Sequence, residues 1–120
     1  MTVQSEERAT PESVNEVRLR GRISVDPEER GVPSGDRLLT FRVIVDRPPE
    51  ARRGRRSVDV LDCTVWRPAA RKHVRRWRAG DVVEVEGALR RRFYRLGTTT
   101  GSRVEIEVMS GRLIRRRASA

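Results

Sequence analysis

This chain of 120 residues has little of what disulfide-stabilised, metal-binding or membrane-spanning proteins depend on. Its one cysteine, Cys63, and one histidine, His73, can form no internal disulfide and cannot supply the usual ligands of a zinc site. No apolar run approaches the roughly 20 residues that span a bilayer, and no apolar signal core opens the chain. These absences predict a soluble, cytoplasmic protein without a metal, a cofactor or a membrane partner.

The charge of the chain is strongly positive. Lysine and arginine number 27 against 17 acidic residues, which gives a net charge of +10 at pH 7. Such a charge favours polyanionic partners, nucleic acid above all. All the basic residues except Lys72 are arginine. Codon bias would account for that imbalance. Whatever its origin, arginine forms bidentate pairs with phosphate and stacks on bases better than lysine does.

Apolar and polar residues alternate along five segments, which predicts five strands that each bury one face. The segments begin near Val17, Leu39, Val58, Val82 and Val104. The residues expected on the buried faces are Val17, Leu19, Gly21, Ile23, Val25, Leu39, Phe41, Val43, Val45, Leu61, Cys63, Val65, Val83, Val85 and Leu89. Residues 26–28 break the first strand, residues 33–36 form a turn, and residues 97–101 reverse the chain before the last strand.

A short helix is expected between the third and fourth strands. Pro68 suits its first turn, Gly80 suits its end, and Ala70, Val74 and Trp77 form one apolar stripe. Five strands with a helix in this position give an all-β fold, the five-stranded OB-fold barrel. The barrel would occupy residues 15–114, between a disordered N-terminal segment (residues 1–14) and a basic C-terminal end (residues 115–120).

Two aromatic residues are expected on outer faces among arginines. Trp66 ends the third strand and Tyr94 lies on the continuation of the fourth. Aromatic rings can stack nucleobases while arginines hold the phosphate backbone, which predicts a site for single-stranded nucleic acid. The expected phosphate contacts are Arg42, Arg47, Arg52, Arg53, Arg55, Arg56, Arg90 and Arg92. The arginines of the loop at residues 46–57 could equally be a solvated run of charge, but the loop joins two strands of the expected ligand face.

Other residues that could carry chemistry have simpler explanations. Trp77 lies on the apolar stripe of the helix and is expected to fill the core, and Cys63 falls among core positions as a packed thiol. Solvated outer faces of strands account for the carboxylates Asp59, Asp62, Glu84 and Glu86. With no phosphate-binding glycine loop and no nucleophile elbow, the chain is not expected to be an enzyme.

Several segments together resemble bacterial single-stranded-DNA-binding proteins. They are residues 15–23, residues 26–28 with Arg30 and Gly35, residues 62–66 with Ala70, and residues 80–92. The resemblance implies an OB barrel that forms homo-oligomers, dimers or tetramers, and binds single-stranded DNA without sequence preference in replication, repair or recombination, in the cytoplasm and at the nucleoid. It assigns base stacking to Trp66 and Tyr94.

The chain also departs from the pattern of that family. Two further stacking positions fall at Val60 and near Pro49, so stacking is replaced in part by charge and binding is expected to be weaker and more dependent on salt. A basic end stands where the family carries an acidic tail, which predicts no recruitment of repair enzymes through such a tail. Outward arginines on the first strand, Arg18, Arg20 and Arg22, would set like charges against each other between subunits.

These departures leave a second function open. The chain could be an OB-fold interaction subunit of a nucleic-acid-processing assembly, with weak or RNA-directed binding. Stacking does not depend on the sugar, so direct binding by stacking would also admit RNA as a ligand. The net charge and the retained Trp66 and Tyr94 favour direct binding of single-stranded DNA.

Overall fold

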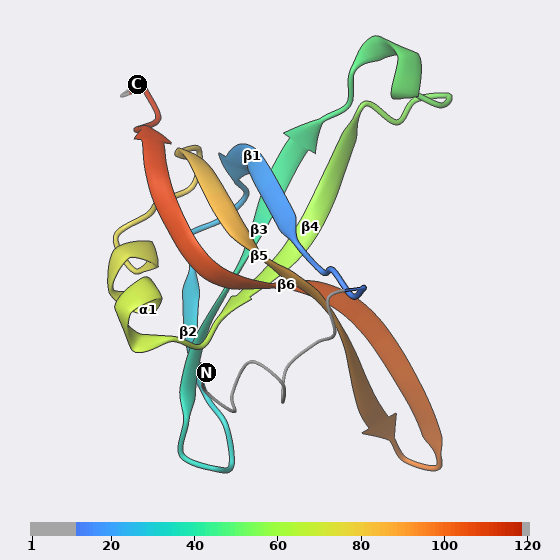
Figure 1. Ribbon diagram of the computed structural model, residues 1–120, viewed down its shortest axis with the longest axis vertical. Coiled ribbons are helices and arrows are strands. Elements are labelled where there is room, and N and C mark those ends of the chain that lie inside the picture. The colour runs from blue at the N-terminus through green and yellow to red at the C-terminus, as the bar shows by residue number, and fades with distance from the viewer. Residues whose placement is uncertain (1–11, 119–120) are drawn as a thin grey trace.

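The chain folds into a closed β-barrel with one helix, described for residues 12–118 in a computed structural model (Figure 1). Its elements are β1 (Val17–Ile23), β2 (Glu28–Gly31), β3 (Arg37–Asp46), the 3-10 turn η2 (Pro49–Ala51), β4 (Val58–Val65), α1 (Pro68–Val74), β5 (Val82–Leu96) and β6 (Thr99–Arg115). The ring runs β1–β5–β6–β4–β3 and closes through pairing of β3 with β1. This confirms the five-stranded OB-fold barrel, with its helix between β4 and β5, the third and fourth barrel strands in chain order.

The ends of the chain are described only in part. Of the segment expected to be disordered, residues 1–11 lie outside the described residues, and so do residues 119–120 of the basic end. The limits of the domain at residues 15 and 114 therefore stay a prediction.

The apolar stripe expected on the helix helps to fill the barrel, but the helix end expected at Gly80 was wrong, because α1 ends at Val74. Ala70 and Val74 are buried, and Trp77 just beyond the helix is only 3% exposed. Its ring meets Phe41 of β3 edge-on, with centroids 5.6 Å apart and an interplanar angle of 87°. Cys63 is buried in the same cluster. Trp77 and Cys63 are thus parts of the core.

A sixth strand was not expected from the sequence. β2 pairs with β3 as a hairpin, and all four of its residues are exposed, so no apolar alternation announces it. The first strand correspondingly stops at Ile23, and Val25, expected in the core, is 59% exposed. The segment forms a strand because β3 offers it an unpaired edge.

The core assignment of Leu89 was wrong, because the alternation of buried residues in β5 breaks beside a β-bulge in the paired strand β6. The pairing of β5 with β6 shifts between Glu86 and Gly87, and from there the buried face passes to Ala88 while Leu89 is 47% exposed. The extra residue at this shift is Met109 of β6, and a bulge bends and twists the sheet locally. Gly87 makes this possible, since a Cβ there would collide with the carbonyl oxygen of Glu107.

Two long arms leave the barrel on the same side in Figure 1. One is formed by the ends of β3 and β4 with the arginine-rich loop between them, and the other by the β5–β6 hairpin. The hairpin turns at Gly97 and Thr98, so residues 99–101, expected in the turn, already belong to β6. Helix α1 and the C-terminal end of β6 lie on the other side of the barrel.

The arginines of β1 do not form an uncompensated row of like charge within the chain, and their effect between subunits stays a prediction. Glu84 of β5 binds Arg20 at 3.1 Å and Arg112 of β6 at 2.9 Å, and Arg22 pairs with Asp46 at 3.3 Å. Arg18 stands opposite Glu86 in the register of β1 and β5.

Candidate nucleic-acid interface

A groove follows the outer face of β3 and β4. It consists of two hollows that share the lining residues Arg30, Thr40, Thr64, Arg103 and Glu105. One hollow continues to Arg42 and Asp62, and the other continues to Trp66 and Arg92. Strand alternation explains the arrangement, because these outward side chains of β3 and β4 alternate with the core residues. A linear ligand can lie along such a groove.

Trp66 does not present a bare ring to the groove. The guanidinium carbon of Arg92 lies over it, 5.5 Å from the ring centroid. Glu105 accepts a hydrogen bond of 2.8 Å from Arg92 Nε and one of 3.1 Å from the Thr64 hydroxyl. Glu105 is only 3% exposed, whereas the Arg92 side chain is 41% exposed. The buried carboxylate therefore fixes Arg92 from behind and leaves its outer edge open to a ligand.

Tyr94 lies farther out, on the β5–β6 arm. It is 45% exposed and stands opposite Gly101 of β6. A Cβ at Gly101 would come within 2.5 Å of Tyr94 Cζ, so the tyrosine ring lies across the glycine backbone. Tyr94 lines neither hollow of the groove. The structure thus places the two expected stacking residues on different parts of the molecule, Trp66 in the groove and Tyr94 on the arm.

The arginines of the loop at residues 46–57 lie on the other arm, outside the lining of the groove. Arg47 is held in place by Asp59 at 2.6 Å, with its side chain only 23% exposed, and it organises the base of the loop. This contact holds the pKa of the Asp59 carboxyl below its usual range and raises the pKa of Arg47. Arg52 and Arg53 donate to backbone carbonyls within the loop.

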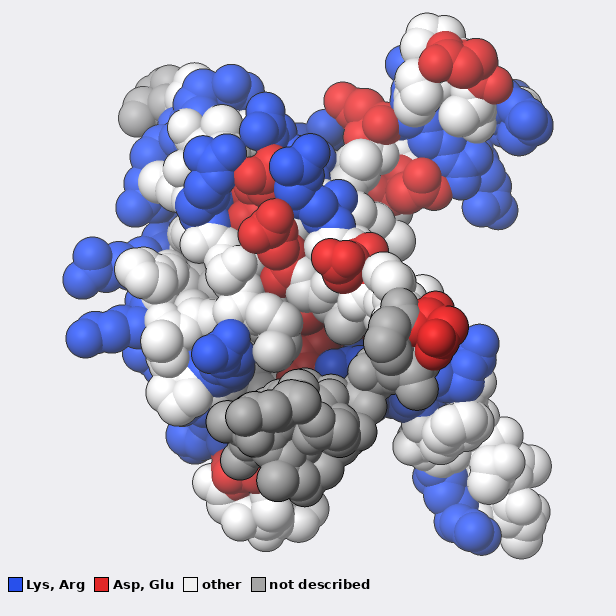
Figure 2. All heavy atoms as spheres, in the orientation of Figure 1, with Lys and Arg blue, Asp and Glu red and all other residues white. Residues whose placement is uncertain are grey.

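Carboxylates accompany the remaining expected phosphate contacts. Arg42 pairs with Asp62 and Arg90 with Glu107, each at 2.8 Å, as Arg92 pairs with Glu105. In Figure 2, acidic side chains run through the middle of the visible face, and basic ones gather on the arms and at the opposite edge. The groove therefore carries less net positive charge than its arginines alone indicate.

Several lining residues were not expected from the sequence. Arg30, Arg103 and Glu105 were not expected there. Arg30 comes from β2, which pairs with the edge of β3, and the other two come from β6, which reaches β4 only when the barrel closes. Thr40 and Thr64 could have been found, since both alternate with core residues and share a face with Arg42 and Trp66.

Two kinds of chemistry have no support in the described chain. Burial raises the pKa of the Cys63 thiol to about 12, so it stays protonated and is no nucleophile at neutral pH. Within residues 12–118, no three histidine, cysteine or acidic side chains gather in a way that could hold a metal ion.

None of the helices described within residues 12–118 is long and apolar enough to cross a membrane.

Residues 14–114 match the model of the single-strand binding protein family. The chain belongs to this family. A single-stranded DNA-binding protein of Halalkalibacterium halodurans is 35% identical over 98 residues, which are 81% of this chain and 57% of that protein. Single-stranded DNA-binding protein A of Bacillus subtilis is 35% identical over 81 residues, 68% of this chain and 47% of that protein. The chain thus spans about half the length of the family members it matches.

The fold agrees with this membership. The structure of a Plasmodium falciparum SSB in complex with ssDNA superimposes with a TM-score of 0.70, over 89% of this chain and 98% of that one. The two sequences are 23% identical, so this similarity concerns the fold. The family indicated by residues 15–23, 62–66 and 80–92 is confirmed.

Proposed function

We propose that this chain binds single-stranded DNA without sequence preference and catalyses no reaction. The observation that carries the proposal is the Trp66–Arg92–Glu105 unit in the groove, which combines a π-surface with a fixed guanidinium. Bases stack on such surfaces whatever their identity, and the guanidinium edge binds phosphate. The family relatives named as single-stranded DNA-binding proteins support the same ligand.

The proposed path uses the groove and both arms. Bases stack at Trp66 and Arg92 and again at Tyr94, while Arg42 and Arg90 contact phosphates along the way. On the other arm, Arg52, Arg53, Arg55 and Arg56 add phosphate contacts. None of the four forms an ion pair among the described residues, although the charge of Arg56 helps to lower the pKa of the Asp59 carboxyl. Arg47 serves as a structural anchor of that loop through Asp59. Binding of this kind keeps a strand unpaired during replication, repair or recombination, in the cytoplasm and at the nucleoid.

We further propose that the domain of residues 15–114 assembles as a homo-oligomer. One face of the β5–β6 arm exposes Leu89, Phe93 and Val104, at 47%, 76% and 42%. Exposed apolar residues on one face mark a surface for protein contact, and a second copy of the arm would cover it. Gel filtration with light scattering measures the mass of the particle, and a monomer at micromolar concentration would contradict this part.

The decisive test is a titration with oligo-dT followed by tryptophan fluorescence. Trp66 borders the groove while Trp77 is buried, so we expect quenching that disappears in Trp66→Ala. Duplex DNA of equal charge serves as the control and oligo-rU reports binding of RNA. Failure of the wild-type protein to bind oligo-dT at moderate salt would refute the proposal. It would favour a function as an OB-fold interaction subunit of a nucleic-acid-processing assembly.

A further inference from the structure

The positive charge that no carboxylate compensates gathers away from the groove. Arg30, Arg42, Arg92 and Arg103 in the groove each have an acidic partner within 4 Å. A different surface surrounds the end of α1 and the end of β6, on the side of the barrel opposite the arms (Figure 1). We name it the α1–β6 basic surface, and its exposed side chains are Lys72, Arg76, Arg78, Arg116 and Arg117.

Most of these cations have no acidic partner. Within residues 12–118, Lys72, Arg76 and Arg117 form no ion pair, and the Arg78 guanidinium donates only to the backbone carbonyls of Arg75 and Trp77, at 3.0 and 2.8 Å. A carbonyl orients a guanidinium without neutralising it. Three carboxylates border the surface. Asp26 accepts a hydrogen bond from the backbone amide of Ala79, Glu28 pairs with Arg30, and Asp81 pairs with Arg116.

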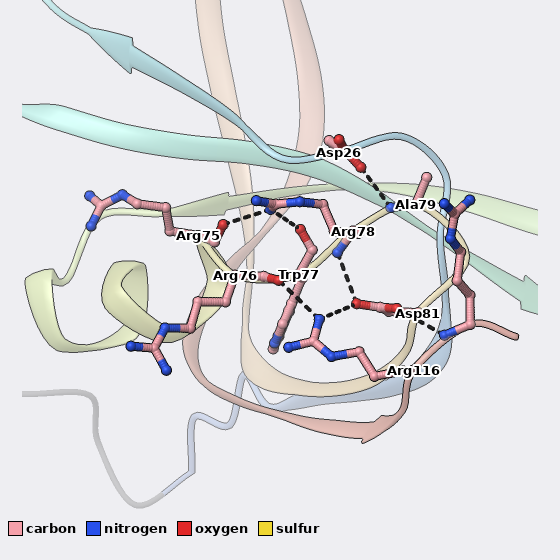
Figure 3. Close-up of polar contacts among 9 residues, drawn as sticks. Asp26, Arg75, Arg76, Trp77, Arg78, Ala79, Asp81 and Arg116 are labelled. Atoms are coloured by element: carbon pink, nitrogen blue, oxygen red, sulfur yellow. Dashed lines mark hydrogen bonds and ion pairs between the residues drawn. The ribbon is translucent and has the colours of Figure 1, made fainter. Parts of the chain in front are cut away.

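A buried carboxylate fixes the two parts of the surface against each other. Asp81 is 1% exposed and accepts hydrogen bonds from the backbone amides of Arg78 and Arg117 and from the Arg116 guanidinium, at 2.9, 3.0 and 2.9 Å (Figure 3). The Arg116 guanidinium also donates to the carbonyl of Arg76. Figure 3 shows the Arg76 side chain directed away from this cluster. The backbone of the surface is therefore held in place, and the exposed side chains of Lys72, Arg76 and Arg117 remain open to a ligand.

The chemistry of the surface favours duplex over single-stranded nucleic acid. Trp77 is the aromatic residue nearest in sequence, and it is buried, so it offers no ring on which unpaired bases could stack. Binding there depends on charge, and a duplex carries about one charge per 1.7 Å and releases about 0.9 counterions per contacted phosphate, against about 0.7 for a single strand. A purely cationic surface therefore binds a duplex more strongly.

We propose that the α1–β6 basic surface binds the backbone of duplex nucleic acid while the groove holds a connected single strand. The chain would thereby recognise the junction between paired and unpaired DNA. This inference rests on the proposed function, since it needs a strand in the groove. Trp66 favours such a connection, because it directly precedes Arg67 and Pro68 at the start of α1. Two linked contacts raise affinity through the effective concentration of the second.

The test compares three fluorescein-labelled ligands: a single strand, a duplex hairpin, and the same hairpin with that single strand as an overhang. We expect the junction ligand to bind about ten-fold more tightly than the strand alone. The variant Lys72→Gln/Arg76→Gln should abolish that gain, lower the log–log salt slope for the junction by about 1.8, and leave binding of the single strand unchanged.

A charge-matched variant, Arg18→Gln/Arg91→Gln, removes the same charge from β1 and β5 and should still bind the junction ligand more tightly than the single strand. Loss of that difference in this variant would indicate a general charge effect and overturn the assignment of duplex binding to the α1–β6 basic surface. Equal affinity for strand and junction would also overturn it while leaving single-strand binding intact. Failure of the single strand itself to bind would instead refute the proposed function. If polyglutamate binds the α1–β6 basic surface and the hairpin does not, the ligand of that surface is an acidic protein and the nucleic-acid assignment is wrong.

Discussion

The side-chain amide of Asn15 forms two hydrogen bonds with the backbone of Leu89, one in each direction and both of 2.8 Å. It lies just before β1, whose pairing with β5 begins at Val17 and Gly87. An asparagine side chain carries the same donor and acceptor as a peptide group and can extend a ladder by one step. Here it covers β5 immediately after the bulge.

Removing that amide should loosen the bulge. We expect Asn15→Ala to lower the free energy of unfolding by about 1–2 kcal/mol, because two hydrogen bonds of ordinary net value are lost. Chemical denaturation measures the change. The adjacent exposed residue Glu16 gives the control, and Glu16→Ala should have almost no effect; an unchanged stability in Asn15→Ala would show that water replaces the amide at no cost.

Arg92 and Arg90 provide a matched pair on the same strand. Arg92→Ala leaves Glu105 buried with only Thr64 and a weaker contact to Arg103 at 3.7 Å, so we expect a loss of about 1–3 kcal/mol of stability and a change in Trp66 emission. Arg90 pairs with Glu107 nearer to solvent, and Arg90→Ala should cost less than about 1 kcal/mol. Equal losses in thermal or chemical denaturation would contradict the role of buried Glu105.

Gly101 should matter for the position of Tyr94. In Gly101→Ala the new methyl group displaces the tyrosine ring, so single-strand affinity should fall as it does in Tyr94→Ala, by about 1–3 kcal/mol if a base stacks there. Fluorescence titration of both variants measures this, with Ser102→Ala as the control. Full affinity in Gly101→Ala together with a loss in Tyr94→Ala would mean that the ring binds in another position.

The arginine loop should contribute charge without stacking. Arg55→Gln/Arg56→Gln removes two exposed cations, and we expect the log–log salt slope for oligo-dT to fall by about 1.4, with maximal quenching of Trp66 unchanged. Titrations between low and moderate salt give the slope. An unchanged slope would mean that these arginines are solvated surface charges that do not contact phosphate.

Asp81 should make the free energy of unfolding depend on pH in the acid range. Burial raises its pKa, but hydrogen bonds from Arg117, Arg78 and Arg116 outweigh burial and hold the pKa below its ordinary value of 3.8. A depressed carboxyl pKa contributes stability that is present above pH 3.8 and is lost as the pH falls through the lower, folded value.

The measurement is denaturation of the wild type and Asp81→Asn at several pH values. At pH 7 the variant should be less stable by about 2 kcal/mol, since charged hydrogen bonds are lost. The difference should narrow in the acid range below the ordinary aspartate pKa. A difference that stays constant with pH would mean that shape, and not charge, is what Asp81 contributes.

The sequence by itself determined the strand faces, the helix and the family. Alternation decides which side of a strand is apolar, which is why Leu39, Phe41 and Cys63 were placed correctly in the core. The alternation failed to place Leu89, because a β-bulge depends on how two strands pair and not on the sequence of one strand. The close contact of Gly87 with β6 is seen only in the folded structure. The alternation also missed β2, whose pairing depends on the free edge of β3 and not on its own residues.

Only the tertiary structure decided what each arginine is available for. In the sequence all the arginines are equivalent cations, yet Arg47 is tied to Asp59, Arg92 is tied to Glu105 across the barrel, and Arg76 has no acidic partner among the described residues. Pairing depends on distances between residues far apart in the chain, and local periodicity carries no information about them. The number of charges was therefore fixed by composition, whereas their division between the groove and the α1–β6 basic surface was fixed by folding.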